Sequence, residues 1–232
     1  AGPYTRDYAA PLTAAAASVR DMTLVQAYQG AAAGARLKGA VVQKLTIKGE
    51  SGGALTCEAD LIGKEVDDGT LAVLSDRTVE FALGHMVSLY IDTWAGTIGS
   101  TAVSATAFNF ELEIESGREL THHLGGLTPT RYSENRWGGT LKLVLELTST
   151  MQTLWTAIAE QTAYEGRQIR IKAQSGTKVI QLDFAGVFTE APEAYGEEDG
   201  VLTIEATLEG MYNSGLGNWF EAQIVNSVSA LP

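Results

Sequence analysis

A strict alternation of apolar residues with acidic or polar residues through 108–115 constrains the fold more than any other feature. Phe108, Phe110, Leu112 and Ile114 alternate with Asn109, Glu111, Glu113 and Glu115. Successive side chains of a β-strand point to opposite faces of the sheet. The pattern therefore predicts a strand with one buried face and one solvated face, as in an antiparallel sheet.

The same period of two recurs elsewhere in the chain. Leu45 and Ile47, then Leu55, Cys57, Ala59 and Leu61, flank the glycine-rich turn at 49–53 and predict a β-hairpin. On this pattern Cys57 belongs to the buried face as an unreactive thiol. Further strands are expected at 87–91, 141–147, 169–171, 179–189 and 200–210, whereas 63–86 is expected to be a loop or a partly ordered excursion.

One segment has a helical period instead. Met151, Leu154, Trp155 and Ile158 fall on one helical face within 149–165, with Ser149 as a cap and Gly166 as a stop. The predicted fold class is mostly β with one flanking α-helix, in a β-sandwich or barrel arrangement. The predicted core comprises Phe108, Phe110, Leu112, Ile114, Leu141, Leu143, Leu145, Leu154, Trp155 and Ile158.

Composition excludes several classes of protein. The 232 residues carry a net charge of −12, so the basic surface that grips nucleic acid or anionic membranes is missing. A single cysteine excludes an intrachain disulfide framework, and no apolar run approaches the roughly 18 residues of a membrane span. The first residues have no methionine and no signal-peptide pattern, so we expect processing or a missing upstream part.

Residues with catalytic or metal-binding potential are present but poorly placed. The histidines are His85, His122 and His123, and two adjacent histidines on a strand point to opposite faces. There is no phosphate-binding loop and no Gly-x-Ser-x-Gly elbow. The glutamates of 111–115 form a row at steps of about 7 Å without aromatic neighbours, unlike a sugar-cleaving site. We predict no enzyme activity, no metal and no cofactor.

The acidic residues themselves are the candidate functional feature. Each lies on the polar face of a strand whose other face is apolar: Glu58, Asp60, Glu111, Glu113, Glu115, Glu205 and Glu209. Two interpretations remain open. These faces serve ordinary solubility, or they converge on one shared acidic surface.

Three segments resemble the tail tube proteins of long-tailed bacteriophages. The first is 37–65, with Leu37-Lys38-Gly39-Ala40 and Asp60-Leu61-Ile62-Gly63-Lys64. The second runs from Leu89-Tyr90-Ile91-Asp92 through Ile98-Gly99-Ser100-Thr101 to the strand at 108–114. The third is 169–176, followed by 202–212. Each motif by itself is a common pattern of strand and turn residues. The order and spacing of the motifs carry the resemblance over most of 37–212.

The resemblance implies a structural virion protein of the phage tail. Its β-sandwich subunits assemble into stacked hexameric rings in the host cytoplasm, and inner strands join across subunits into one barrel. About 24 strands at 4.8 Å spacing and a tilt of about 40° give a wall roughly 50 Å across, which passes a DNA duplex. The implied partners are copies of this chain, a tape-measure protein, tail-end proteins and double-stranded DNA in transit, with no membrane.

The resemblance also suggests roles for particular residues. The acidic residues named above become candidates to line the channel. The predicted domains are an N-terminal arm or remnant at 1–40, the β-sandwich at 41–212 and a C-terminal arm at 213–232. An acidic loop at 190–199 is the candidate inter-subunit contact, through Glu190, Glu193, Tyr195, Glu197, Glu198 and Asp199.

Two alternatives stay open at this point. One is the tube of a contractile injection or secretion system, which passes protein instead of DNA. The other is a stand-alone β-sandwich binding module, for which Trp94, Trp137 and Trp219 in loops would supply exposed rings.

Overall fold

The computed structural model describes residues 3–11, 21–26, 34–69, 81–103, 107–149, 151–153, 156, 166–189, 193–198 and 200–228. Strands dominate this part of the chain, and the α-helical residues are 149, 151–153 and 156. A short 3-10 helix, η2, spans Gly84–Met86. The predicted fold class, mostly β with one short α-helix, is confirmed. Of the predicted core, Leu154, Trp155 and Ile158 lie outside the described residues.

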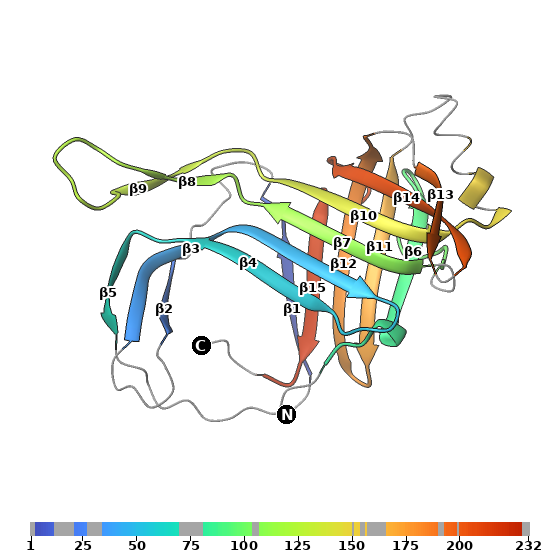
Figure 1. The fold of residues 1–232 in the computed structure, drawn as a ribbon, viewed down its shortest axis with the longest axis horizontal. Helices are drawn as coiled ribbons and strands as arrows, with labels where there is room; N and C mark the ends of the chain where they lie inside the picture. The colour runs from blue at the N-terminus through green and yellow to red at the C-terminus, as the bar shows by residue number, and fades with distance from the viewer. Residues whose placement is uncertain are drawn as a thin grey trace.

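Six antiparallel strands form what we call the large layer (Figure 1). Their order across the layer is β4-β3-β7-β10-β14-β13. Their bounds are β3 (Gly34–Glu50), β4 (Thr56–Ile62), β7 (Ala107–Glu115), β10 (Gly138–Glu146), β13 (Glu193–Glu198) and β14 (Val201–Gly210). The predicted hairpin is present as β3–β4, and the strand predicted from 108–115 is β7.

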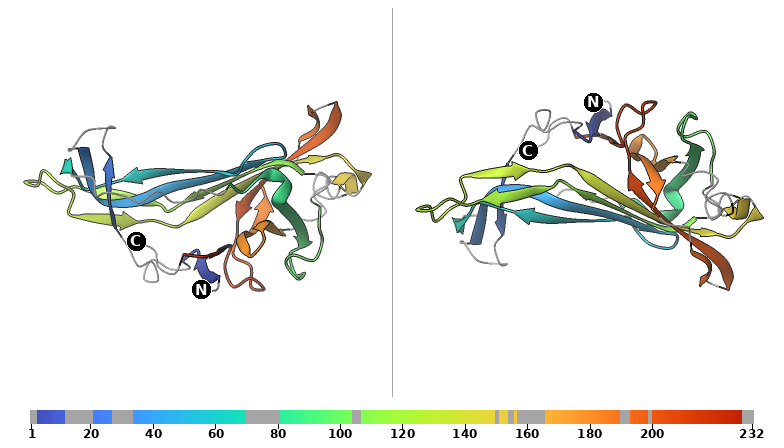
Figure 2. Two further views of the ribbon diagram at one scale, coloured as in Figure 1. Left: turned by 90° about the horizontal axis from the view of Figure 1, so that it is seen from below. Right: turned by 90° about the horizontal axis from the view of Figure 1, so that it is seen from above.

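Five further strands form the small layer, in the order β6-β11-β12-β15-β1. Their bounds are β1 (Tyr4–Ala9), β6 (Val87–Thr93), β11 (Arg167–Ser175), β12 (Lys178–Phe188) and β15 (Phe220–Asn226). The end of β12 also pairs with β14, with Gly186 opposite Gly210. The two layers are thus parts of one 13-stranded sheet that bends over at β12 into a sandwich (Figure 2).

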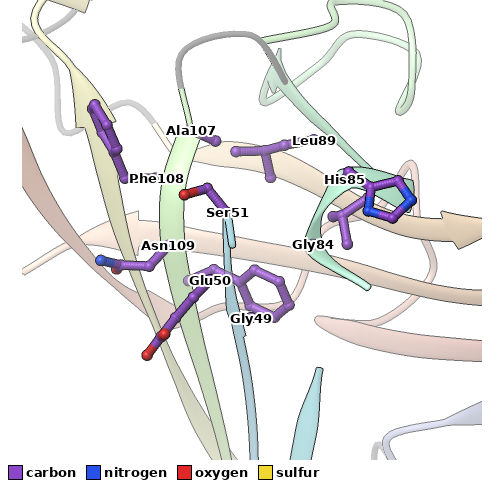
Figure 3. A pocket seen from close by; sticks show the side chains of 11 residues that line it. Gly49, Glu50, Ser51, Gly84, His85, Leu89, Ala107, Phe108 and Asn109 are labelled. Atoms are coloured by element: carbon purple, nitrogen blue, oxygen red, sulfur yellow. The ribbon is translucent and has the colours of Figure 1, made fainter. Parts of the chain in front are cut away.

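The hydrophobic core fills the space between the layers. The predicted residues Phe110, Leu112 and Ile114 of β7 are buried, as are Leu141, Leu143 and Leu145 of β10. From the small layer they meet a second set of buried side chains, namely Leu89, Ile169, Ile171, Leu182, Phe184 and Phe220. Phe108 is only half-buried, and its predicted place in the core was wrong: a register shift between β7 and β10 places Ala107 opposite Leu145 on the core side, and the Phe108 ring lies on the same side of β7 as Asn109 (Figure 3).

The protruding end of the molecule extends past the sandwich (Figure 1). It consists of β2 (Met22–Gln26), residues 34–43 of β3, β5 (Glu65–Gly69), and the hairpin of β8 (Arg118–Thr121) and β9 (Arg131–Glu134). β2 and β5 flank the first part of β3 on its two sides. β5 lies in the segment for which a loop was expected, so that expectation was wrong for 65–69.

Strand β15 lies within 213–232, the segment predicted as a C-terminal arm. Phe220, Ala222 and Ile224 face the core side of β12, opposite Phe184, Leu182 and Ile180. Trp219 is 7% exposed and packs edge-on against Phe184 at 5.9 Å between ring centroids. Two glycines make room for the indole, since a Cβ at Gly139 or Gly210 would lie 2.5 or 2.6 Å from it. The sequence analysis did not identify this strand, because its apolar residues are few and are separated by the polar residues Glu221 and Gln223.

Cys57 is exposed, so its predicted place in the core was wrong. The small layer does not extend under β4, and Leu61 on the same side of that strand is 37% exposed. Partial burial still raises the pKa of the Cys57 thiol above its ordinary value. The apolar side of β4 is therefore a surface of the isolated chain.

Candidate functional site

The strand register places the predicted acidic residues on a single face of the large layer. Residues directly opposite one another in antiparallel strands point to the same side. One row across five strands is Glu58, Thr46, Glu113, Thr140 and Glu209. The register adds Glu50 and Glu146 to the seven predicted residues. We call this surface the acidic face: Glu50, Glu58, Asp60, Glu111, Glu113, Glu115, Glu146, Glu205 and Glu209.

Three lysines share this face, and the sequence analysis did not include them. Lys44 Nζ lies 2.7 Å from Glu113, and Lys48 Nζ lies 3.1 Å from Glu111. The hydrogen bond that Lys44 donates to Glu113 raises the pKa of Lys44 above its ordinary value. Lys142 stands opposite Glu111 on the neighbouring strand. On β3, β4, β7, β10 and β14, nine carboxylates against three lysines leave a net charge of −6 on the face.

The carboxylates at the margins of the face are open to water. Glu58, Glu205 and Glu209 are exposed, and among the described residues no cation lies within salt-bridge distance of them. The lysines could have been found in the sequence, because Lys44 and Lys48 alternate with Leu45 and Ile47 on the same strand. Which glutamates they would meet depended on the register of β3 against β7, which the sequence did not specify.

The two ends of the large layer bend toward the side of the acidic face. Seen edge-on, β2, β5 and the start of β3 rise from one end of the large layer, and β13 rises from the other end (Figure 2). Both ends rise on the side opposite the small layer. The acidic residues therefore lie on the side of the sheet toward which its two ends bend.

Of the candidate inter-subunit residues at 190–199, those at 193–198 belong to a strand. Residues 193–198 form β13, which pairs with β14 through Glu193 opposite Glu205 and Glu198 opposite Val201. Glu190 and Asp199 lie outside the described residues. Within the described strands, β13 pairs only with β14 and β4 only with β3, so the large layer has an open edge on each side. Open edges present unpaired N–H and C=O groups to other chains.

A buried carboxylate on the small layer has a structural role that sequence analysis missed. The Asp92 carboxylate accepts hydrogen bonds from the Gly99 N–H at 2.6 Å, the Ser100 hydroxyl at 2.6 Å and the Thr101 N–H at 2.8 Å. Burial opposes ionisation, but these donors outweigh it and lower the pKa of Asp92. The signal was an aspartate ending one strand, followed seven to nine residues later by Gly-Ser-Thr.

The described residues contain no cluster of three or more His, Cys, Asp or Glu side chains able to hold a metal ion. His122 and His123 follow β8 in the turn of the hairpin, where His123 Nδ1 bonds the Thr130 hydroxyl. No helix in the described part of the chain has the length and apolar character to cross a membrane. The acidic face and the open edges are thus the features from which function has to be argued.

A family model described as phage tail tube protein matches residues 4–211. The chain belongs to the phage tail tube protein family. The match covers the segments that carried the resemblance in the sequence, and that resemblance is confirmed. A search of curated proteins found no match. Membership of this family makes the protein a structural component of the phage tail, and hence of the virion.

Proposed function

We propose that this tail tube protein assembles into stacked hexameric rings whose channel is lined by the acidic face. The observation that carries the proposal is that nine carboxylates and three lysines lie on one side of the large layer, the side toward which its ends bend (Figure 2). The opposite side of β3, β7, β10 and β14 faces the core. A subunit that presents the acidic face to a central channel keeps its core intact and exposes its charge inward.

The charge gives the channel a function during DNA ejection. Proteins bind duplex DNA mainly by replacing condensed counterions with lysines and arginines, and carboxylates offer no such exchange. A hexameric ring would carry six times −6, about −36, on this surface. Screening limits the reach of each charge to about 8 Å at physiological salt, so the lining acts on a duplex that passes close to the wall.

The open edges support self-assembly. Joining β4 of one copy to an edge of the next would satisfy its unpaired backbone groups and cover the exposed side of Cys57 and Leu61. The second open edge, available for contact with another copy, is β13, which contains Glu193, Tyr195, Glu197 and Glu198. Assembly in the host cytoplasm, with a tape-measure protein and tail-end proteins as further partners, belongs to the same proposal.

Exchanging acidic-face residues for lysine tests which surface lines the channel. Glu111 and Glu113 are poor choices, because Lys44 and Lys48 contact them and a reversal would place lysines side by side. Glu58 and Glu209 are exposed and lie in the same row. We expect tubes of the Glu58→Lys, Glu209→Lys variant to bind linear duplex DNA, increasingly so at low salt.

The form of the DNA locates the binding surface. A linear duplex can enter a tube from its end, whereas covalently closed circular DNA cannot. Binding of linear but not circular DNA, measured by cosedimentation with tubes seen in the electron microscope, places the variant lysines inside. Binding of both forms would place the acidic face outside and overturn the proposal. The matched controls are Glu58→Gln, Glu209→Gln, and Asp7→Lys on the outer side of the small layer.

A further inference from the structure

The tip of the β8–β9 hairpin carries two leucines that are fully exposed. Leu124 is 107% exposed and Leu127 is 102% exposed, the highest values among the large hydrophobic residues of the described chain. They stand on either side of Gly125-Gly126, at the far end of the long axis (Figure 1). Apolar side chains presented together on a protrusion mark contact with another molecule more often than ordinary surface.

The tip has a defined shape. The Gly126 N–H donates to the His123 carbonyl at 3.3 Å, and the Thr130 N–H donates to the Thr121 carbonyl at 3.2 Å. The His123 ring bonds the Thr130 hydroxyl at 2.8 Å, and Gly125 has a φ of +85°, which suits glycine. These bonds close the turn and leave both leucines pointing into water.

The base of the hairpin is fixed to the protruding end. The Tyr132 hydroxyl donates to the Gly39 carbonyl, and Lys64 lies over the Tyr132 ring at 4.6 Å. Arg118 lies over the Trp137 ring at 5.5 Å. Because its base is held on two sides, the hairpin projects the leucines in a fixed direction. Little conformational entropy is therefore lost when the leucines bind.

An apolar cavity lies at the opposite end of the large layer (Figure 3). It has a volume of about 320 Å³ and opens between the end of β3, the start of β7 and β6. Its apolar walls include Val87, Leu89, Ala107 and Phe110, and Glu50 and Ser51 stand at its edge.

Charge favours the pairing of tip and cavity. The tip, 121–131, contains Arg131 and no acidic residue, in a chain of net charge −12. The cavity is bordered by Glu50 of the acidic face. A contact between opposite ends of two identical chains is heterologous, and repeated contacts of that kind form rings or continuing stacks.

We propose that Leu124 and Leu127 of one copy insert into the Val87–Leu89–Ala107–Phe110 cavity of the next copy in the tube. The inference rests on the proposed self-assembly and assigns one of its contacts. The leucines leave water, the apolar walls of the cavity are covered, and Arg131 of the tip approaches Glu50 at the cavity margin. Copies are thereby held head to tail by a contact separate from the strand edges.

Cysteine cross-linking tests the contact directly. In a Cys57→Ser background, Leu124→Cys is combined with Ser51→Cys at the cavity edge. We expect oxidation of assembled tubes to yield disulfide-linked multimers of this double variant. The matched control combines Leu124→Cys with Thr5→Cys, which is exposed on the small layer, and should give at least tenfold fewer linked chains.

The outcomes separate this contact from the proposed function. Tubes without tip-to-cavity links overturn the contact and leave the tube proposal standing. Protection of the Ser51→Cys thiol in such tubes would mean that another segment fills the cavity, and it too overturns the contact. Links between chains that never form tubes would support the contact and contradict the tube. A chain that neither links nor assembles contradicts both.

A second variant gives an independent measure. Leu124→Ser combined with Leu127→Ser should raise the protein concentration needed for tube assembly by tenfold or more. The thermal unfolding of the isolated chain should stay unchanged, because both side chains are fully exposed there. Assembly at the wild-type concentration would overturn the proposal.

Discussion

The sandwich and the protruding end each contain an arginine with a forked pair of bonds to an aspartate, and the two pairs differ in setting. In the sandwich, Arg170 donates to Asp183 at 2.7 Å through both Nε and Nη2, and Asp183 is 4% exposed. In the protruding end, Arg36 donates to Asp67 at 2.8 and 2.6 Å, but both side chains are open to solvent. The two pairs have similar geometry but should contribute differently to the free energy of unfolding, because water already solvates the exposed pair.

The difference extends to the two regions as a whole. The sandwich buries aromatic and branched residues from both layers, whereas the protruding end is held mainly by strand pairing and by surface ion pairs such as Lys38 with Glu65 at 3.8 Å. We infer that the sandwich sets the stability of the isolated subunit. The protruding end contributes little to that stability, and we propose that its role is to contact other copies.

The largest expected effect is in the sandwich core. Phe110→Ala should lower the free energy of unfolding by about 3–5 kcal/mol, because Phe110 is 7% exposed and packs against Gly49. Val66→Ala in the protruding end, where Val66 is 67% exposed, should change it by less than about 0.5 kcal/mol. Urea denaturation followed by tryptophan fluorescence measures both. Similar losses of unfolding free energy in the two variants would contradict the division of the molecule into two regions.

The two forked pairs give the sharpest form of the comparison. Asp183→Ala should cost about 3 kcal/mol, because it leaves Arg170 without its partner in a largely buried site. Asp67→Ala should leave the denaturation midpoint unchanged within error, since the Arg36 guanidinium returns to water. If Asp67→Ala destabilised the isolated chain as strongly as Asp183→Ala, the protruding end would belong to the same stability unit as the sandwich.

A smaller effect concerns the stability of the folded chain at acid pH. The pKa of Asp92 is lower in the folded chain than its ordinary unfolded value of about 3.9. The ionised form is thus favoured by folding, and its contribution is complete above that pH and lost as pH falls through the folded pKa. Asp92→Asn should therefore reduce stability at pH 7 and make the fall in stability below about pH 4 shallower. Melting temperatures between pH 2 and 7 measure this, and an unchanged slope would contradict it.

The same acid titration distinguishes the two regions. Asp67 also has a lowered pKa, owing to its bonds with Arg36 and Lys38, but these bonds lie at the surface, where the Asp67 side chain is 28% exposed. Salt screens such surface charges more than buried ones. Asp67→Asn should therefore change the pH dependence of stability much less than Asp92→Asn does, and raising the salt concentration should leave the part due to Asp92 largely intact.

The smallest effect is expected at Cys57, on the open edge of the large layer. The exposed thiol should react with a thiol reagent in the folded, isolated chain, and Cys57→Ser should change stability by less than about 0.5 kcal/mol. Tubes should protect this thiol if β4 is covered by a neighbour. Equal reaction rates in tubes and isolated chains would mean that no neighbouring copy covers β4 in the tube.

The alternation of residues along single strands determined much of this structure in advance. It predicted β7, β10 and the β3–β4 hairpin, and it assigned Phe110, Leu112, Leu141 and Leu143 to the core. It also assigned the glutamates of β7 to a solvated face. Such assignments depend only on the period of the strand, which is a local property of the backbone.

The pairing of strands decided the rest. Whether Glu58, Glu113 and Glu209 share a surface depends on the register of five strands that are distant in the sequence. The same register brings Lys44 and Lys48 to the glutamates. Cys57 has the sequence pattern of a core residue, yet it is exposed because no strand of the small layer reaches it. A strand's period says which side chains share a side, but only the tertiary structure decides what covers that side.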